Sequence, residues 1–253
     1  MCRVIERPSQ IYYFPPCGFG FWYLLGRYET IKTDENVILV GASAGSLICV
    51  CSLLTKEDLI INVLKCAEET RKEYKTINLY LIITIFIDKL FNHIDRTNLE
   101  TNLNKIRIQT TELTGWRSIV KHQIKPKTLS HLRELVLASC YIPILSNYNN
   151  LLYFNVDGKK MCDGIFVDFY VKNVFTTFDV TNYTNAIDLI IIPSNTKIIK
   201  MYNEGLSDGK MYELNKQFTM EKKITIVTLP FIVVLVFVLV LCFMKDSTIV
   251  LLI

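Results

Sequence analysis

The sequence predicts a three-layer α/β/α domain followed by a single transmembrane helix. Two observations support this prediction. Over residues 1–200, short apolar segments alternate with longer segments of helical character, as expected when helices cover a sheet. Residues 224–244 then form an apolar stretch without a charged residue. With 253 residues, the chain is long enough for one such domain with a sizeable core.

The expected elements follow one another along the domain. Strands are expected at Ile11–Phe14, Val37–Val40 and Ala186–Pro193, and a hairpin joins Leu151–Val156 to Lys159–Cys162 around Asp157-Gly158, a strong turn signal. The apolar stretch Leu79–Leu90 is too short to cross a bilayer, so we expect it in the core. The expected helices are Phe19–Thr30, Ala44–Leu54, Leu59–Tyr74 and Ser130–Ser139.

The composition favours association with a membrane and does not indicate binding to nucleic acid. Hydrophobic residues make up 51% of the chain, and the mean hydropathy is +0.29, which is high for a soluble domain. The net charge is only +4 and the charges are scattered, so nucleic-acid binding is not indicated, whereas weak attraction to anionic lipid is compatible. The eight cysteines form no CxxC pair and no zinc-site spacing with histidine, which favours a reduced, cytosol-facing domain without metal.

Residues 224–244 are the predicted membrane span. As a helix, this stretch would be roughly 31 Å long, close to the hydrocarbon thickness of a bilayer. Lysines are more numerous on its N-terminal side, which places that side in the cytosol. We therefore expect a tail anchor, with a polar linker at 201–223 and a short tail at 245–253. The alternative is a buried core helix.

A candidate nucleophile lies between a strand and a helix. The apolar segment Val37–Val40 runs into Gly41-Ala42-Ser43-Ala44-Gly45, which has the Gly-x-Ser-x-Gly pattern, and an apolar helical segment follows. Such a turn holds a serine in a sharp, strained bend at a helix N-terminus, where developing negative charge is stabilised. The sequence therefore favours Ser43 as a nucleophile over a serine in a plain glycine turn.

The base that would serve Ser43 is either a histidine or a carboxylate. The only histidines are His93, His122 and His131, and none lies in the last part of the chain, where an α/β-hydrolase would place it. A carboxylate can accept the serine proton directly if it lies within hydrogen-bond reach. Asp163, which follows a predicted strand, is a candidate for this role, although an Asp-Gly pair is often only a turn.

Four stretches together resemble the patatin-like phospholipase family, and within it the subgroup of adipose triglyceride lipase and adiponutrin. Their order and spacing agree with the family from Ile11 to Asp168. They are Cys17–Gly26, Gly41–Gly45, Ala138–Pro143 and Gly158–Gly164.

The resemblance implies a lipid acyl hydrolase with a Ser-Asp dyad. Ser43 would be the nucleophile and Asp163 the base, and the reaction would need no metal or organic cofactor. An oxyanion hole would be formed by backbone N–H groups around Cys17, Gly18 and Phe19. The motif glycines would be Gly41, Gly45 and Gly164. The substrate would be a lipid at a membrane surface.

Several positions depart from the family pattern. Pro16 and Phe21 stand where the glycine loop usually has glycine, and Pro16 cannot donate an N–H. Ile165 replaces a small residue, and Asp168 and Phe169 replace the common Asn and Pro. A catalytically inactive, membrane-anchored adaptor with the same fold is therefore the alternative function.

Overall fold

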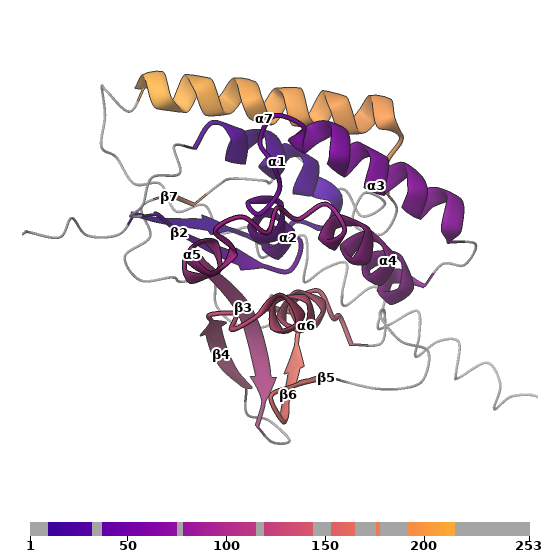
Figure 1. Cartoon of the computed structure of the whole chain (residues 1–253), viewed down its shortest axis with the longest axis vertical. Helices are drawn as coiled ribbons and strands as arrows, with labels where there is room; N and C mark the ends of the chain where they lie inside the picture. Colours follow the sequence, from indigo (N-terminus) through magenta and orange to yellow (C-terminus); the bar gives the residue numbers. More distant parts are fainter. Residues whose placement is uncertain are drawn as a thin grey trace, which may run out of the picture.

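The chain forms a mixed α/β structure built on a sheet rich in parallel strands (Figure 1). The computed structural model describes residues 10–31, 37–74, 78–114, 119–143, 153–164, 176–177 and 192–215.

The described sheet has seven strands in the order β5-β6-β3-β2-β1-β7, and β4 pairs with β3. The neighbours β3, β2, β1 and β7 run parallel to one another, whereas β4 and β6 are antiparallel to β3. The strands are β1 (Gln10–Phe14), β2 (Val37–Ala42), β3 (Ile106–Leu113), β4 (Ile119–Ile124), β5 (Phe154–Val156), β6 (Lys159–Cys162) and β7 (Thr176–Thr177).

The helices pack mainly on one face of this sheet. On that face, β1 contributes Tyr12 and Phe14 to a core that also contains residues of every described α-helix. The other face carries a smaller cluster of Tyr13, Val40 and Ala42. The helices are α1 (Phe21–Glu29), α2 (Gly45–Cys51), α3 (Leu59–Glu73), α4 (Leu79–Phe91), α5 (Leu99–Asn104), α6 (Leu129–Ser139) and α7 (Asn195–Asn215), and a 3₁₀ turn, η1 (Gly18–Gly20), precedes α1.

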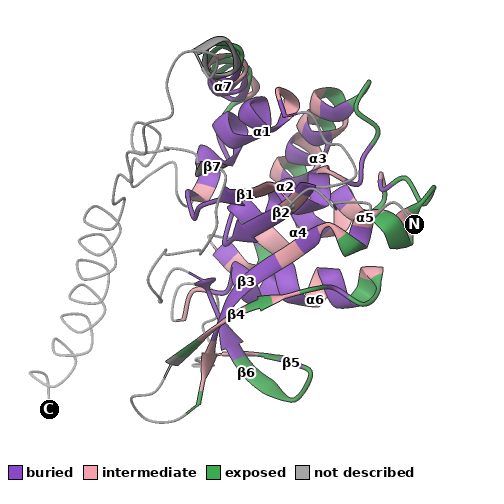
Figure 2. Cartoon of the chain, turned by 90° about the vertical axis from the view of Figure 1, so that its left-hand side faces the viewer, coloured by how far each residue is buried: buried purple, intermediate pink, exposed green. Residues whose placement is uncertain are grey.

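The α/β prediction is thus confirmed, but the three-layer prediction only in part. Within the described ranges, one helical layer covers the sheet, and no second layer is seen on the Tyr13 face. Figure 2 shows burial concentrated in the central strands and in α1 and α2, whereas the β5–β6 turn is exposed. The predicted hairpin around Asp157-Gly158 is confirmed as β5 and β6.

Strand β3 brings the ends of β2 and β6 together. Ala42, the last residue of β2, pairs with Gln109, and Cys162, the last residue of β6, pairs with Thr111. Because β4 occupies the other edge of β3 across these positions, β2 and β6 share one edge. The two strands therefore point toward each other, and both end next to Thr110. This arrangement places the residues that follow them side by side.

Residues 201–215 differ from the sequence prediction of a polar linker. They form most of α7, which lies along α1 (Figure 1). Glycines allow the close approach, since a Cβ at Gly205 would lie 2.1 Å from the Tyr23 carbonyl oxygen and one at Gly26 would lie 2.1 Å from the Tyr202 carbonyl oxygen. The polar surface of α7 faces away from this contact, which is why its sequence resembles a linker.

Several predicted segments lie outside the described residues. These include the strand at 186–191, the remainder of the linker at 216–223, the transmembrane helix at 224–244 and the tail at 245–253. Among the helices that are described, none is both long and apolar enough to cross a bilayer.

Candidate active site

Ser43 sits on a strained turn between β2 and α2. Its backbone has φ of 51°, a left-handed conformation that is uncommon for a residue other than glycine. Strain of this kind costs of the order of 1–3 kcal/mol and persists only where surrounding structure holds it. The serine is 7% exposed, so its side chain is nearly enclosed. The strand–turn–helix context predicted for the Gly-x-Ser-x-Gly pattern is confirmed.

The two glycines of the motif allow close backbone contacts. A Cβ at Gly41 would lie 2.5 Å from the Gly45 carbonyl oxygen, and one at Gly45 would lie 2.1 Å from the Phe14 carbonyl oxygen. Real Cβ atoms do not approach backbone so closely, so neither position accepts a side chain without movement. The end of β1 therefore lies directly against the turn that carries Ser43.

Asp163 forms a hydrogen bond with the Ser43 side chain. The Ser43 hydroxyl donates to Asp163 Oδ2 over 2.6 Å, at the short end of the range for O–H···O hydrogen bonds. Asp163 is completely buried. The pairing follows from the topology, because Ser43 follows β2 and Asp163 follows β6, the two strands that end beside Thr110. The two residues singled out from the sequence are therefore in direct contact.

The backbone of Asp163 is held from two sides. Its N–H donates to the Tyr141 carbonyl over 2.9 Å, and its carbonyl accepts from Thr111 Oγ1 over 2.9 Å. The next residue, Gly164, packs tightly, since a Cβ there would lie 2.7 Å from the Gln109 carbonyl oxygen. The glycine of the Asp-Gly pair therefore serves close packing against β3.

The backbone of Ser43 is held in a similar way. Its N–H donates to Ser139 Oγ over 2.8 Å, and its carbonyl accepts from the Ser46 hydroxyl over 2.6 Å. The Ser139 hydroxyl in turn donates to the Gln109 carbonyl over 2.7 Å. These supporting residues carry no distinctive sequence signal, although Ser139 lies within Ala138–Pro143, one of the four stretches that resemble patatin-like phospholipases.

Titratable neighbours of Asp163 stay neutral near pH 7. Burial, together with the nearby Asp163 charge, raises the pKa of Cys162 to about 12. Burial and the same carboxylate also raise the pKa of Cys140, and burial is the main cause of the raised pKa of Tyr13. These neighbours therefore add no negative charge beside the carboxylate.

The predicted oxyanion loop lies at the same end of the sheet as Ser43. Cys17, Gly18 and Phe19 follow the end of β1, and Gly18 has a φ of 51° that suits glycine. Cys17 is buried, and its pKa is raised by burial and by Cys140, whose sulfur lies 3.7 Å from Ser46 Oγ. The loop is thus near the nucleophile turn, and its role as an oxyanion hole stays a prediction.

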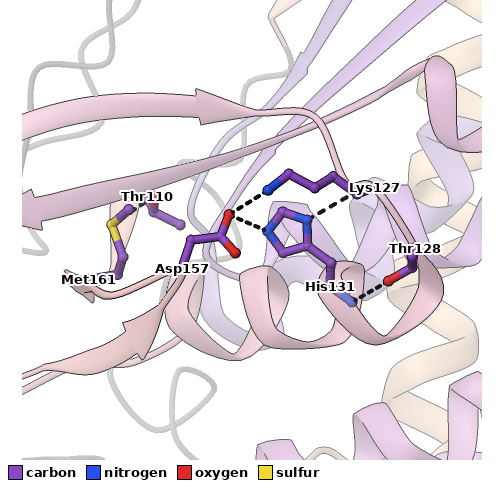
Figure 3. Close-up of polar contacts among 6 residues, drawn as sticks. All are labelled: Thr110, Lys127, Thr128, His131, Asp157 and Met161. Carbon is purple, nitrogen blue, oxygen red and sulfur yellow. Dashed lines mark hydrogen bonds and ion pairs between the residues drawn. The ribbon is translucent and has the colours of Figure 1, made fainter.

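Two of the three histidines, His122 and His131, lie beside carboxylates other than Asp163. His122 Nε2 lies 2.6 Å from Glu112 Oε2. His131 Nδ1 accepts from the Lys127 N–H over 3.1 Å, and its Nε2 lies 3.5 Å from Asp157 Oδ2 (Figure 3). These contacts do not favour a Ser-His-Asp triad.

Two of the five residues that depart from the patatin-like pattern lie within the described residues. Pro16 and Phe21, two of the departures from the patatin-like pattern, are buried beside the loop. Ile165, Asp168 and Phe169 lie outside the described residues. Among described residues, no group of three His, Cys, Asp or Glu side chains is placed to hold a metal ion.

Comparisons with known proteins find similarity at the level of structure. No family model and no curated protein sequence matches the chain. The structure is similar to a chain of the heterodimeric ExoU–SpcU complex from the type III secretion system of Pseudomonas aeruginosa, with 8% identity, a TM-score of 0.40, and coverage of 85% of this chain and 53% of that chain. It is also similar to VipD from Legionella pneumophila, with 11% identity, a TM-score of 0.38, and coverage of 87% and 57%. The chain spans little more than half the length of each of these two proteins.

Proposed function

We propose that this chain is a lipid acyl hydrolase, with Ser43 as nucleophile and Asp163 as base. The observation that carries the proposal is the 2.6 Å hydrogen bond from Ser43 Oγ to Asp163 Oδ2. A serine hydroxyl is a weak nucleophile by itself and gains reactivity from an adjacent general base. Here the base is a buried carboxylate, and the serine sits on the strained turn typical of serine hydrolases.

The proposed reaction proceeds through an acyl-enzyme. Ser43 Oγ attacks the ester carbonyl carbon while its proton moves to Asp163 Oδ2. The tetrahedral intermediate then collapses, the bond to the alcohol breaks, and Asp163 returns the proton to the leaving alkoxide. In the second half a water molecule attacks the acyl-serine carbonyl carbon and loses a proton to Asp163. The bond from this carbon to Ser43 Oγ then breaks, Asp163 returns the proton to Ser43 Oγ, and the fatty acid leaves.

The oxyanion of the intermediate needs donors other than the Ser43 N–H, because that group donates to Ser139. The N–H groups of Cys17, Gly18 and Phe19 are the proposed donors. A glycine at position 18 lets the backbone approach a developing oxyanion closely. Pro16 has no N–H group, so the proposed oxyanion hole begins with the residue that follows it.

The lipid class of the substrate rests on the resemblance of four sequence stretches to patatin-like phospholipases. The proposed membership of the adipose triglyceride lipase and adiponutrin subgroup rests on the same stretches. A membrane segment at 224–244 is part of the proposal, because it would hold the site beside a bilayer that contains the substrate. The lysine excess before this segment supports a cytosolic position for the domain.

A lipid panel tests the proposed activity. The full chain, in detergent micelles, is given phosphatidylcholine, phosphatidylethanolamine, diacylglycerol or triacylglycerol, and released fatty acid is measured. We expect release from at least one lipid, and its loss in Ser43→Ala. Hydrolysis of short nitrophenyl esters alone would contradict the lipid assignment. A folded chain that hydrolyses nothing would support the inactive adaptor instead.

Carbonate extraction tests the proposed membrane segment. Membranes from cells that express the full chain are washed at alkaline pH, which strips peripheral proteins. A span at 224–244 predicts that the chain stays in the pellet, and release into the wash would contradict it.

A further inference from the structure

Ser139 joins the nucleophile turn to the centre of the sheet. It is the last residue of α6, and its side chain is completely buried. Its hydroxyl accepts the Ser43 N–H over 2.8 Å and donates to the Gln109 carbonyl over 2.7 Å. Both bonds are to backbone groups, so the Ser139 hydroxyl holds the main chain of Ser43 and acts on the reacting hydroxyl only through it.

Gln109 continues this connection to the residue after the proposed base. Its side-chain Nε2 donates to the Gly164 carbonyl over 3.2 Å, and Gln109 is completely buried. Three hydrogen bonds therefore run from the backbone of Ser43, through Ser139 and Gln109, to Gly164. Gly164 directly follows Asp163. The connection therefore links the backbones of the two proposed dyad residues, in addition to the direct hydrogen bond between their side chains.

The conformation of Ser43 explains why such a connection is needed. With φ of 51°, its backbone tends to relax unless its surroundings hold it. Ser46 holds the carbonyl side of the residue, and Ser139 holds the N–H side. Without the Ser139 hydroxyl, the Ser43 N–H would lose its partner in a buried environment, and the turn would be free to rotate toward another acceptor.

We propose that Ser139 is a positioning residue, which fixes the Ser43 backbone so that Ser43 Oγ stays aligned with Asp163. This inference rests on the proposed function, because it concerns the same reaction. Misplacing a reacting group by about 1 Å can cost about 100-fold in rate. Loss of alignment slows the chemical step and leaves substrate binding largely unchanged. We therefore expect a lower kcat and little change in KM.

The test compares Ser139→Ala with wild type in the full chain, using a nitrophenyl ester. We expect kcat to fall about 10- to 100-fold, with KM changed less than about threefold. The rate of inactivation by a fluorophosphonate should fall by a similar factor, because that reaction also depends on the Ser43 hydroxyl. All rates are expressed per folded molecule, measured by circular dichroism.

Thr70→Val is the matched control. Thr70 is completely buried, and its hydroxyl donates to the Cys66 carbonyl over 2.7 Å within α3. This variant also loses a buried hydroxyl hydrogen bond, but not one that touches Ser43. Its kcat should stay within about twofold of wild type, so loss of stability alone does not reproduce the Ser139 effect.

A second pair keeps the test decisive if Ser139→Ala does not fold. Ser139→Thr keeps the hydroxyl, whereas Ser139→Cys replaces it with a weakly hydrogen-bonding thiol. We expect the threonine variant to have at least about tenfold higher kcat than the cysteine variant. Equal or higher kcat in the cysteine variant would overturn the inference, as would a Ser139→Ala kcat within twofold of wild type.

The failure of this inference can be told apart from failure of the proposed function. Ser43→Ala is measured in parallel. If wild type shows no turnover that depends on Ser43, the proposed function fails and the role of Ser139 falls with it. If wild type is active and the Ser139 variants keep their kcat, only the positioning role is overturned.

Discussion

Replacing Asp163 with asparagine separates the proposed chemistry from the stability of the fold. The substitution keeps the shape of the side chain and leaves its backbone bonds to Tyr141 and Thr111 in place. It replaces a carboxylate 2.6 Å from Ser43 Oγ with an amide, which is a very poor proton acceptor. General-base catalysis contributes about 10²- to 10⁴-fold in rate. That range corresponds to about 2.7–5.5 kcal/mol of transition-state stabilisation.

Two assays on the same preparation measure the effect. Hydrolysis of a nitrophenyl ester should show kcat/KM reduced by about 10²- to 10⁴-fold in Asp163→Asn. Urea denaturation should show no loss of stability, because a neutral amide is less costly to bury than a carboxylate. The expected result is therefore a folded chain of at least wild-type stability with little activity.

Asp157→Asn is the matched control, since this aspartate lies in the exposed turn before the same strand, β6. Its kcat/KM should stay close to wild type. The reasoning is refuted if Asp163→Asn keeps kcat/KM within tenfold of wild type. A second result would also refute the reasoning. If replacing His93, His122 and His131 together abolishes activity in a folded chain, the base is a histidine and not Asp163.

Three further predictions test the surroundings of the site. Gly45→Ala should lower the free energy of unfolding by about 3 kcal/mol in urea titration, because its Cβ would lie 2.1 Å from the Phe14 carbonyl oxygen; a stability equal to wild type would contradict this close contact. The hydrogen bond from Lys127 holds the pKa of Asp157 below its usual value. This contact therefore stabilises the fold above about pH 3.8, and its contribution is lost as the pH falls below that value. The difference in urea midpoint between wild type and Asp157→Asn should therefore shrink below about pH 3.8, and a constant difference would argue against the contact. Burial raises the pKa of Cys162 to about 12, so peptide mapping after treatment with a disulfide reagent at pH 8 should find this thiol modified only in unfolded protein.

The nucleophile turn could be predicted from local sequence. Val37–Val40 is apolar and β-branched, and the small residues around Ser43 suit a strained turn at the start of a helix. The structure confirms both features, because Gly41 and Gly45 lie where a Cβ would meet backbone atoms. Local pattern is sufficient to predict the order of strand, turn and helix, whereas the contacts that hold the turn, from Phe14 and Ser139, come from distant parts of the chain.

The position of β3, the strand that lies beside both Ser43 and Asp163, could not be predicted from local sequence. In β3, the side chains of Gln109, Thr110 and Thr111 are completely buried, although their residue types usually face solvent. Their burial depends on partners far away in sequence, such as the Gly164 carbonyl that accepts from Gln109. The contact between β3 and the segments that carry Ser43 and Asp163 therefore depends on tertiary structure.

The sequence of α7 predicts a linker over residues 201–215, where the structure has a helix, for a related reason. Its buried residues Ile198, Met201 and Tyr202 have helical spacing, but they form a narrow stripe among polar residues. Gly205 lowers intrinsic helix propensity, yet it allows the close approach to α1 that stabilises the helix. The packing that overrides the weak propensity is not visible in the α7 sequence alone.

Covalent labelling tests the central claim most directly. The full chain is treated with a fluorophosphonate, digested, and analysed by mass spectrometry to locate the adduct. The proposed dyad predicts one phosphonylated residue, Ser43, with labelling abolished in Ser43→Ala and slowed at least about 100-fold in Asp163→Asn. A folded wild-type chain that stays unlabelled, or an adduct on another serine, would contradict the assignment of Ser43 and Asp163 as a catalytic pair.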